Sequence, residues 1–246
     1  MELAVINRPS AVVYSSRYRI GKRLLDLAIC ILLLPVAAPL LAVCFVVIRI
    51  DSAGPGLFKQ ERIGKGGRPF RMYKLRTMRY DLDYSHHQDY MRQFVRGCTS
   101  TPSHFATCHP ALAKTFVGKH LDPASQSKMA NKPVQAWQTT RVGRILRKTS
   151  LDELPQIFNV LKGEMSLVGP RPNVRCEVEE CQPWHCERLE VLPGITGLAQ
   201  IHGRSCISFD YIAMYDVQYI REWSLSLDLR ILFLTMVSVF KEAGAL

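Results

Sequence analysis

One long apolar segment dominates the hydrophobic pattern of this 246-residue chain. From Leu27 to Ile48 there are about 22 residues without a charge, enough to cross a bilayer as a straight helix. Pro35 and Pro39 lie near the middle, where each removes a helix hydrogen bond and favours a kink. We therefore predict a re-entrant helix-break-helix over residues 20–50, which enters one leaflet and returns. An ordinary kinked membrane span is the alternative.

Basic residues flank both ends of this segment: Arg17, Arg19, Lys22 and Arg23 precede it, and Arg49, Lys59, Arg62, Lys65, Arg68 and Arg71 follow it. Because positive flanks stay on the cytoplasmic side of a membrane, these charges favour the re-entrant form. Asp26 would then lie at headgroup depth, where Arg or Lys can pair with it. Residues 1–19 are expected to form an irregular leader. The apolar segment is not followed by a small-residue cleavage site, so we do not interpret it as a cleaved signal peptide.

A short hairpin is predicted directly after the apolar segment. Leu57–Gln60 and Phe70–Leu75 have the composition of strands, and the Gly-rich stretch Gly64–Gly67 lies between them. Lys74 and Arg76 are two residues apart in an extended stretch, so their side chains are expected to project from one face. That face is either a solvated strand surface or a contact for phosphate.

The remaining pattern is mainly helical. Residues 208–223 and 225–240 have the periodicity of amphipathic helices, and the second is too short in its uncharged run to span a bilayer, so it is a core or an interfacial helix. Residues 193–197 predict a tight turn, and residues 80–138 are taken as a variable insertion. The pattern predicts an α+β fold, mainly α: a monotopic membrane protein with a compact cytoplasmic catalytic domain over residues 51–246 and amphipathic interfacial helices.

Positive charge is concentrated at the start of the chain. The formal net charge is +11, and residues 1–80 hold 14 of the 32 Lys and Arg but only 4 of the 21 Asp and Glu. A surplus that brackets an apolar segment suits anionic lipid better than nucleic acid. It also lacks the interleaved surface aromatics of a nucleic-acid binder. We therefore expect membrane lipid, and no nucleic acid, among the partners.

The eight cysteines are scattered without a repeating spacing, which favours reduced thiols in a cytosol-facing protein. One grouping has a metal-like composition, namely Cys176, Cys181, His185 and Cys186. Structural zinc usually uses paired short spacings in two knuckles. Neither the spacing nor a second knuckle is found here, so a zinc site is not favoured.

Two adjacent acids, Asp152 and Glu153, follow a basic segment and precede an apolar, helix-like run. Adjacent side chains cannot share one helix face, so the two carboxylates can take different roles. Ser150 and Glu153 also match a capping box, in which Glu153 would only bond the Ser150 amide. Against that alternative, Pro155 would fall at the fifth position of such a helix, and Asp152 would have no role.

A proline-rich loop follows the apolar run, Gly169-Pro170-Arg171-Pro172. The prolines leave this loop few backbone states, which would hold the Arg171 side chain in place. A guanidinium fork suits a phosphate or a carboxylate. Arg171 is therefore a candidate contact for an anion.

The sequence motifs occur in a fixed order: KRLLD at 22–26, the proline-broken apolar segment, GPGLFKQERIG at 54–64, YKLRTM at 73–78, TRVGRILRKTSLDELPQIFNVLKGEMSLVGPRP at 140–172, PGITGLAQIHGR at 193–204 and YDVQYIREWSLSLDLRIL at 215–232. In this order they resemble the bacterial sugar transferases, the monotopic phosphoglycosyl transferases that begin polysaccharide or glycoconjugate assembly on a polyprenyl phosphate. The run from SLDELPQ to SLVGPRP is the most specific part of the resemblance.

The resemblance implies that the chain transfers a hexose 1-phosphate from a UDP-sugar, glucose or galactose, to undecaprenyl phosphate at the bacterial inner membrane. Asp152 would be the nucleophile that displaces UMP and carries the phosphosugar. Glu153 would deprotonate the polyprenyl phosphate or help to place a metal. Phosphoryl transfer from a diphosphate calls for Mg2+ and cations. Asp152 is the expected Mg2+ ligand, and the expected phosphate contacts are Lys74, Arg76, Arg141 and Arg171. The product would start exopolysaccharide, capsule or O-antigen synthesis.

Two positions depart from the family pattern. Gln138 stands where members carry an arginine before the TRVGR stretch, which puts one substrate contact or salt bridge in question. Ala38 replaces the serine of the usual Ser-Pro membrane break, which removes a hydroxyl that would satisfy a freed carbonyl. The competing hypothesis is a membrane-anchored scaffold or regulator without catalysis. A homo-oligomer is left open.

Overall fold

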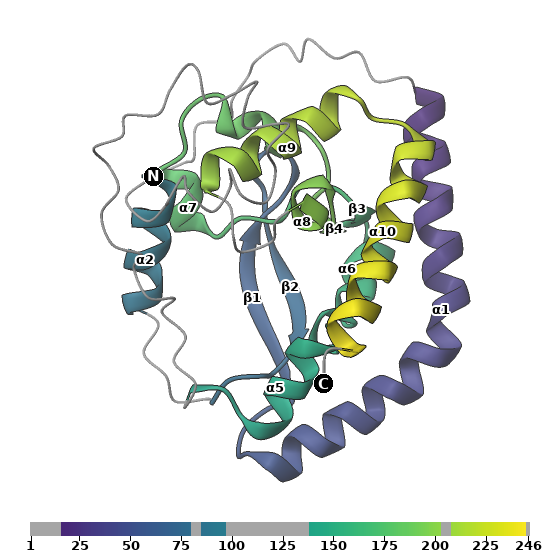
Figure 1. Cartoon of the computed structure of the whole chain (residues 1–246), viewed down its shortest axis with the longest axis vertical. Helices are drawn as coiled ribbons and strands as arrows, with labels where there is room; N and C mark the ends of the chain where they lie inside the picture. The colour runs from purple at the N-terminus through teal and green to yellow at the C-terminus, as the bar shows by residue number, and fades with distance from the viewer. Residues whose placement is uncertain (1–15, 80–84, 97–137, 203–207, 245–246) are drawn as a thin grey trace.

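The computed structural model describes residues 16–79, 85–96, 138–202 and 208–244. Figure 1 shows α1 (Ser16–Asp51) along one edge with α10 (Leu225–Gly244) beside it. The hairpin of β1 (Leu57–Ile63) and β2 (Pro69–Leu75) runs through the centre, and α9 (Phe209–Arg221) crosses one end. Helices make up most of the described chain, and the strands form two small sheets. The predicted α+β fold, mainly α, is confirmed at this level.

The shorter elements complete the molecule: α2 (Ser85–Val95), α5 (Arg141–Lys148), α6 (Gln156–Lys162), β3 (Ser166–Val168), α7 (Arg175–Glu179), β4 (Gly194–Thr196), α8 (Leu198–His202) and the 3-10 helices η1 (Lys65–Gly67), η4 (Leu151–Glu153) and η5 (His185–Glu190). The helices predicted at 208–223 and 225–240 are α9 and α10, so both predictions are confirmed.

The apolar segment forms one continuous helix. α1 spans 36 residues with Pro35 and Pro39 inside it, so the expected break between two helices is not found. Figure 1 shows instead a change of direction in the lower half of α1. The two prolines are four residues apart and therefore remove hydrogen bonds from the same side of the helix, which favours a bend. By length and composition alone, α1 could cross or anchor in a membrane.

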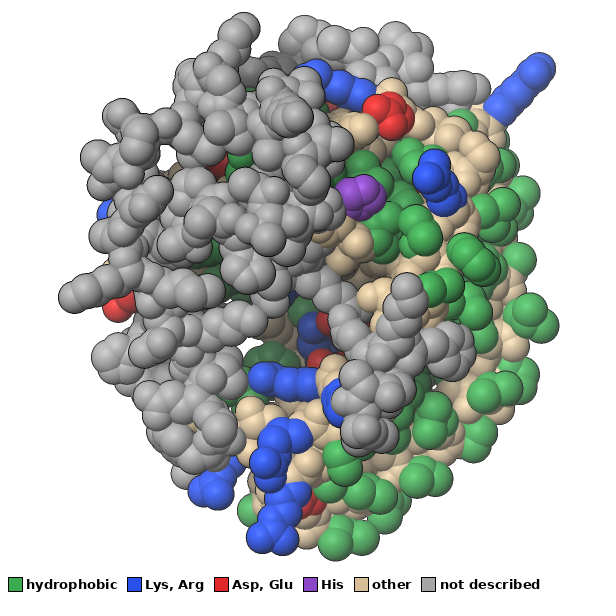
Figure 2. Space-filling view, in the orientation of Figure 1, with side chains coloured by type: hydrophobic (Ala, Val, Ile, Leu, Met, Phe, Trp, Pro, Cys, Tyr) green, Lys and Arg blue, Asp and Glu red, His purple; other side chains and the backbone are tan. Residues whose placement is uncertain are grey.

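Only one side of α1 is covered by protein. Its buried residues recur at helical spacing: Lys22, Asp26, Cys30, Ala37, Cys44 and Ile48. Most of its other apolar side chains are exposed, and so are several of α10, among them Leu225, Leu229 and Phe233. Figure 2 shows hydrophobic side chains spread over the edge where α1 and α10 lie. Such a large uncovered apolar surface is typical of a membrane or partner contact.

Asp26 forms no direct ion pair with Arg or Lys among the described residues, although the sequence had suggested such a pair at headgroup depth. Its carboxylate is buried and accepts hydrogen bonds from Ser166 Oγ at 2.7 Å and from the Leu167 amide at 3.2 Å. The acid therefore joins α1 to β3. Ser166 and Leu167 are about 140 residues away in sequence, so no local pattern could identify them as its partners.

The predicted hairpin is confirmed, with a first strand that extends to Ile63. β1 and β2 are antiparallel, from the pair Leu57 and Leu75 to the pair Ile63 and Pro69. The turn between them uses Gly66 at a φ of 67° and Gly67 at a φ of 74°, a backbone region that favours glycine. Lys74 lies near the end of the second strand and Arg76 just beyond it.

The tight turn predicted at residues 193–197 is wrong, because Gly194–Thr196 is the strand β4. It pairs in parallel with β3, with Ser166 opposite Gly194 and Val168 opposite Thr196. The backbones of the two segments approach unusually closely: a Cβ atom on Gly194 would lie 2.1 Å from the Gly169 nitrogen. The glycines that suggested a turn are thus needed for a close backbone contact.

The described residues pack around two apolar clusters. The larger one joins α1, α6, β3, α8, α9 and α10, and includes Val160, Met165, Tyr219 and Ile231. The smaller one packs Leu146 of α5 against Cys44 and Ile48 of α1 and Leu75 of β2. These clusters fix α5 and α6 against α1 and the hairpin, and so fix the turn between α5 and α6.

Parts of the chain for which the sequence made predictions lie outside the described residues. α1 begins at Ser16, inside the stretch 1–19 expected to be irregular, and residues 1–15 are not described. Of the expected insertion, 80–138, only residues 85–96 and 138 are described. The Gln138 backbone oxygen accepts from the Arg79 amide at 2.9 Å, and Ala38 is exposed on α1.

Candidate active site

The acidic pair lies on the short turn between α5 and α6. Asp152 and Glu153 are in η4, and Pro155 precedes the first residue of α6. α5 ends at Lys148, and Ser150 then adopts a φ of 56°, the only positive φ of a non-glycine residue in the described chain. A left-handed conformation at a serine is strained and is held by its surroundings. The turn therefore presents both acids from a fixed backbone.

The structure contradicts the capping-box interpretation. The Ser150 side chain makes no capping hydrogen bond. The Glu153 carboxylate instead accepts from Lys74 Nζ at 2.8 Å, with a partner 79 residues earlier in the chain. Both side chains are only partly buried. Glu153 therefore forms a tertiary ion pair beside Asp152, as expected of a residue with a functional role.

Asn159 is the residue that brings Lys74 to the acids. It is fully buried in α6, its Oδ1 accepts from the Tyr73 amide at 3.1 Å, and its Nδ2 donates to the Arg71 oxygen at 2.8 Å. The amide side chain thus replaces a strand partner along β2. Because η4 leads directly into α6, this contact sets Lys74 opposite Glu153.

Asp152 is half-buried and its electrostatic surroundings are mixed. Burial raises the pKa of the carboxyl group above its usual range. The positive charges of Lys74 and Arg147 oppose that rise, whereas the negative charge of Glu153 adds to it. A carboxylate with a raised pKa is a stronger nucleophile than an ordinary one, and the two cations favour its ionised form. Asp152 is the best candidate for a reacting group.

Arg147 was not among the residues predicted for the site. Its Nε donates to Thr77 Oγ1 at 2.9 Å, which anchors the guanidinium on the segment that follows β2. It lies on α5, five residues before Asp152, in a run of basic residues. The sequence does not show which of these residues lies near the acids. Only the fold shows that its charge acts on Asp152.

The structure places Arg76 away from the acids. Its buried guanidinium donates to the Ser52 oxygen at 2.7 Å and to the Ala53 oxygen, at the C-terminal end of α1. Cations are favourable at the C-terminus of a helix, where carbonyls lack partners. Arg76 thus joins α1 to β2, and a phosphate contact would require it to leave these carbonyls.

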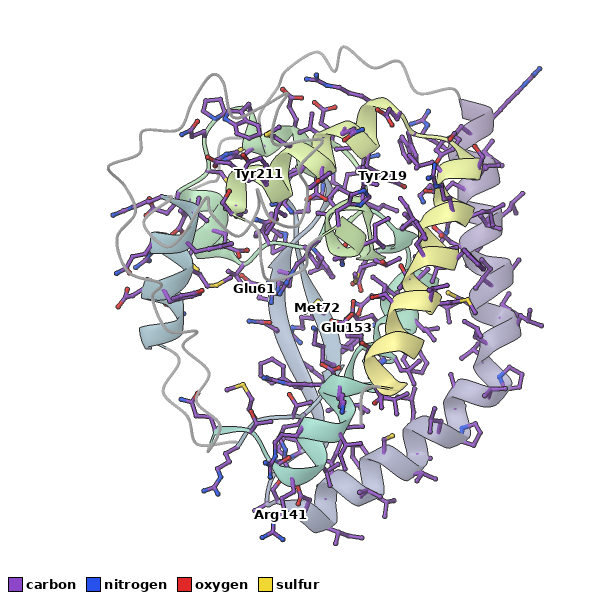
Figure 3. The ribbon with its side chains drawn as sticks, viewed as in Figure 1. Glu61, Met72, Arg141, Glu153, Tyr211 and Tyr219 are labelled. Carbon is purple, nitrogen blue, oxygen red and sulfur yellow. The ribbon has the colours of Figure 1, made fainter. Side chains whose placement is uncertain are left out.

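Arg141 is also separated from the acids. It is exposed at the first position of α5, and Figure 3 shows it at the far end of that helix from Glu153. The described structure therefore brings together Asp152, Glu153 and Lys74, but not Arg76 or Arg141. Their predicted phosphate contacts stay predictions.

Arg171 is exposed on the loop after β3, and a buried arginine lies beneath it. Arg62 of β1 donates to the Pro172 oxygen at 3.0 Å. Burial is the main cause that lowers the pKa of Arg62 to about 10, and the charge of Arg171 lowers it further, while Glu153 opposes this. Arg62, Arg171 and Glu153 therefore act on one another electrostatically. The sequence showed Arg62 only as one of several basic residues.

The cysteine and histidine grouping has no metal-like arrangement in the structure. The described residues contain no group of three or more His, Cys, Asp or Glu side chains able to hold a metal ion. His185 Nδ1 accepts from the Gln182 amide at 3.1 Å, and its Nε2 lies 3.1 Å from Asp210 Oδ1. The ring nitrogens are thus engaged by the loop before η5 and by α9.

The acidic pair fits the modest demand of Mg2+ for protein ligands. This ion is commonly held by one or two carboxylates together with the phosphates of a substrate. Asp152 can supply one carboxylate, whereas Glu153 already accepts from Lys74. The arrangement suits an ion that arrives with a diphosphate better than one held by the protein alone.

Comparison with known proteins shows a family and related sequences. The sequence profile of a family described as bacterial sugar transferase matches residues 17–242. Galactosyl transferase CpsE of Streptococcus agalactiae is 36% identical over 242 residues, which are 96% of this chain and 47% of that protein. The undecaprenyl-phosphate galactose phosphotransferase of Salmonella typhimurium is 34% identical over 235 residues, 94% of this chain and 42% of that protein.

A further relative is nearer in length. The UDP-glucose:undecaprenyl-phosphate glucose-1-phosphate transferase of Caulobacter vibrioides is 34% identical over 246 residues, which are 97% of this chain and 76% of that protein. The chain spans less than half the length of the first two relatives.

Proposed function

The chain belongs to the bacterial sugar transferase family, and we propose that it transfers a hexose 1-phosphate from a UDP-sugar to undecaprenyl phosphate. Glucose and galactose are the sugars to test first, because relatives named for each are similar to this chain. The observation that carries the proposal is the half-buried Asp152 beside Lys74 and Arg147. A catalytic carboxylate among cations is what displacement at a diphosphate requires.

In the first step, a carboxylate oxygen of Asp152 attacks the β-phosphorus of the UDP-sugar. The bond from that phosphorus to the bridging oxygen breaks, and UMP leaves with the electron pair. The hexose phosphate stays on Asp152 as an acyl phosphate. Lys74, Arg147 and Arg171 are the cations placed to stabilise the negative charge that develops on the phosphate oxygens.

In the second step, a phosphate oxygen of undecaprenyl phosphate attacks the same phosphorus. The bond to Asp152 breaks and the carboxylate is restored, which leaves undecaprenyl diphosphate hexose as the product. Glu153 accepts the proton of a protonated polyprenyl phosphate, and its bond to Lys74 fixes the direction of its carboxylate. This product would start the assembly of an exopolysaccharide, capsule or O-antigen.

Mg2+ is the proposed cofactor, with Asp152 as its protein ligand. When bound, it neutralises charge on the diphosphate and on the leaving UMP. UMP release should therefore stop when EDTA removes divalent cations, and return when Mg2+ is added in excess. Persistent release in thoroughly chelated enzyme would remove the metal from the proposal.

The test of the proposed function is UMP release by the detergent-solubilised protein with UDP-glucose or UDP-galactose, with and without undecaprenyl phosphate. Without the lipid, UDP-sugar labelled in the sugar should leave label on the protein, and Asp152→Asn should not become labelled. Glu61→Gln is the matched control, because Glu61 is an exposed acid paired only loosely with Arg175 at 3.3 Å. A labelled Asn variant would exclude Asp152 as the nucleophile.

We further propose that α1, a continuous helix bent near Pro35 and Pro39, enters the membrane from the cytoplasmic side and turns back at its bend, so that the catalytic domain faces the cytoplasm of a bacterial inner membrane. The exposed apolar side chains of α10 continue those of α1, which suits an interfacial helix. Single cysteines introduced at Ser10 and Gly66, in a background without native cysteines, test the topology with an impermeant maleimide. Protection of both until the cells are lysed is expected, whereas labelling of Ser10 alone from outside would indicate a transmembrane helix.

A membrane-anchored scaffold without catalysis is the alternative function. It would keep α1 and its basic flanks but would not need the Lys74–Glu153 pair beside Asp152. The UMP-release assay separates the two, since a scaffold releases none with any UDP-sugar. Retention of a pathway phenotype by the Asp152→Asn variant in cells would favour the scaffold.

A further inference from the structure

The loop that carries Arg171 is held by its backbone from several sides. Four consecutive carbonyl oxygens accept hydrogen bonds: Pro170 from the Gly194 amide at 2.8 Å, Arg171 from Arg188 Nη2 at 3.3 Å, Pro172 from Arg62 Nη1 at 3.0 Å and Asn173 from the Ile63 amide at 2.8 Å. The donors come from β4, η5 and β1. With its carbonyls held inward, the loop leaves the Arg171 side chain exposed.

Two of these donors are buried cations, although a neutral group could hold a carbonyl equally well. Arg62 is 7% exposed and Arg188 is 4% exposed. Burying a guanidinium is costly unless it is paired. Arg62 forms no direct ion pair within the described chain. Its Nε and Nη2 bond the neutral Gln60 Oε1, and the charge of the buried Glu177 acts on it without direct contact. Arg62 is therefore buried beside the loop with no carboxylate bonded to it.

Arg188 has a counter-ion, Asp216, but the hydrogen bonding of this pair is incomplete. Its Nη2 donates to Asp216 Oδ2, while Arg188 Nε and Asp216 Oδ1 have no hydrogen-bond partner among the described residues. Asp216 is therefore shared: the charge of Arg171 also favours its ionised form. Arg188 and Arg171 thus both act on one buried carboxylate beneath the loop.

We propose that Arg62 and Arg188 are positioning residues, which hold the backbone on either side of Arg171 so that its guanidinium points at the diphosphate of the sugar donor. The inference rests on the proposed function, in which Arg171 binds phosphate. Arg188 contacts the carbonyl of Arg171 itself, and Arg62 contacts that of the next residue. Loss of either contact allows the peptide planes around Arg171 to rotate, and the side chain then loses its direction.

The test uses Arg62→Lys and Arg188→Lys, which keep the charge but lose the fork, so that a single ammonium cannot serve both partners. Arg175→Lys is the matched control, because Arg175 is exposed. Steady-state UMP release gives kcat and KM for the UDP-sugar. We expect kcat/KM to fall about 10- to 100-fold in the two buried variants, as for one misaligned hydrogen bond to a charged group, and to stay within about twofold in the control.

The same substitutions made together with Arg171→Ala decide whether the two residues act through Arg171. If they do, Arg62→Lys and Arg188→Lys will lower kcat/KM little further once Arg171 is absent. Equal falls in both backgrounds would overturn the inference, because a general loss of structure lowers activity whether Arg171 is present or not. Thermal unfolding in detergent identifies any variant that is simply unfolded.

A second readout does not depend on activity. Hydrogen exchange of the peptide that covers residues 166–174 should be faster in Arg62→Lys than in the wild type, and unchanged in Arg175→Lys. Unchanged exchange in Arg62→Lys would overturn the inference. Full kcat/KM in Arg171→Ala would also overturn it, but would leave the transfer reaction intact, since labelling of Asp152 tests that reaction separately.

Discussion

Two buried ion pairs in this molecule differ in how completely they are satisfied. At the base of α1, both Asp228 oxygens are used: Oδ2 accepts from Tyr18 OH at 2.8 Å and from Lys22 Nζ at 3.0 Å, and Oδ1 accepts from Tyr219 OH at 2.6 Å. Beneath the Arg171 loop, Asp216 Oδ1 and Arg188 Nε lack partners in the described chain. We name these the Asp228 cluster (Tyr18, Lys22, Tyr219 and Asp228) and the Asp216 pair (Arg188 and Asp216).

The difference separates a structural role from a functional one. The Asp228 cluster ties the start of α1 to α9 and α10, and Tyr219 (labelled in Figure 3) also donates to the Val168 oxygen at 3.2 Å. A buried carboxylate whose two oxygens are both hydrogen-bonded within the protein has little capacity left for a ligand. The Asp216 pair retains unused hydrogen-bonding capacity close to the residue that we assign to phosphate. Incomplete satisfaction is tolerated where binding requires it.

The largest expected effect is a loss of activity, with no loss of stability, on substitution of Asp152 in the site itself. Asp152→Asn should lower UMP release by at least about 10³-fold, because an amide is a far poorer nucleophile than a carboxylate. The melting temperature should not fall, since burial disfavours the charge of Asp152 and Asn removes it. A variant that melts earlier and loses activity in proportion would place Asp152 with the structural groups.

The next effect is on stability, at the Asp228 cluster. Lys22→Met leaves Asp228 buried without a cation and should cost about 3–5 kcal/mol in the free energy of unfolding. Adding Asp228→Asn removes the stranded charge and keeps a carbonyl acceptor for one of the two tyrosines, so it should restore part of that loss. Thermal and denaturant unfolding in detergent measure both. If the double variant is no more stable than Lys22→Met, the cluster does not behave as a buried ion pair.

Local sequence signals predicted the elements but not how they pair. The Gly-rich turn and flanking strands identified the hairpin, and apolar periodicity identified α9 and α10. The strand β4 was mistaken for a turn because glycines suit both. Only its contact with Gly169, 25 residues earlier, shows that the missing side chain makes room for backbone.

The same limit applies to the site. Asp152 and Glu153 stand out in the sequence because two adjacent acids follow a basic run. The sequence alone also allows a capping box, and only the ion pair between Lys74 and Glu153 in the structure excludes it. Arg62 and Arg76 look alike in sequence as basic residues in or after a strand. Both are buried, and only their hydrogen-bond partners distinguish them: Arg62 holds the Arg171 loop and Arg76 holds the end of α1. Such partners are tens of residues away, beyond any local pattern.

A smaller effect, dependent on pH, should distinguish the Asp216 pair. Burial raises the pKa of Asp216 from 3.8 to about 6. A raised pKa in an acid means that its contribution to stability is present below about pH 4 and is lost as the pH rises through about 6. Asn resembles the neutral acid at every pH. Relative to the wild type, Asp216→Asn should therefore become more stable by roughly 1–3 kcal/mol as the pH rises from 4 to 7. This change is added to a loss that does not depend on pH, because Arg188 stays buried without its carboxylate.

Melting temperatures of both proteins at several pH values measure that difference. The same series with Asp228→Asn serves as the comparison, because Asp228 accepts three hydrogen bonds that Asn cannot all replace. A difference between Asp216→Asn and wild type that is flat with pH would show that Arg188 fully compensates Asp216.

The smallest effect should come from an ion pair that is neither buried nor near the site. Arg175 Nη2 lies 3.3 Å from Glu61 Oε1, with the two side chains 51% and 59% exposed. Water screens both charges, and holding two long side chains in one geometry costs entropy. Arg175→Gln should therefore change the free energy of unfolding by no more than about 0.5 kcal/mol, and UMP release by less than twofold. Added salt should not change that result in the variant, because the pair is already broken. A loss comparable to that of Lys22→Met would mean that exposure does not govern the strength of ion pairs here, and the contrast between the two buried pairs would lose its baseline.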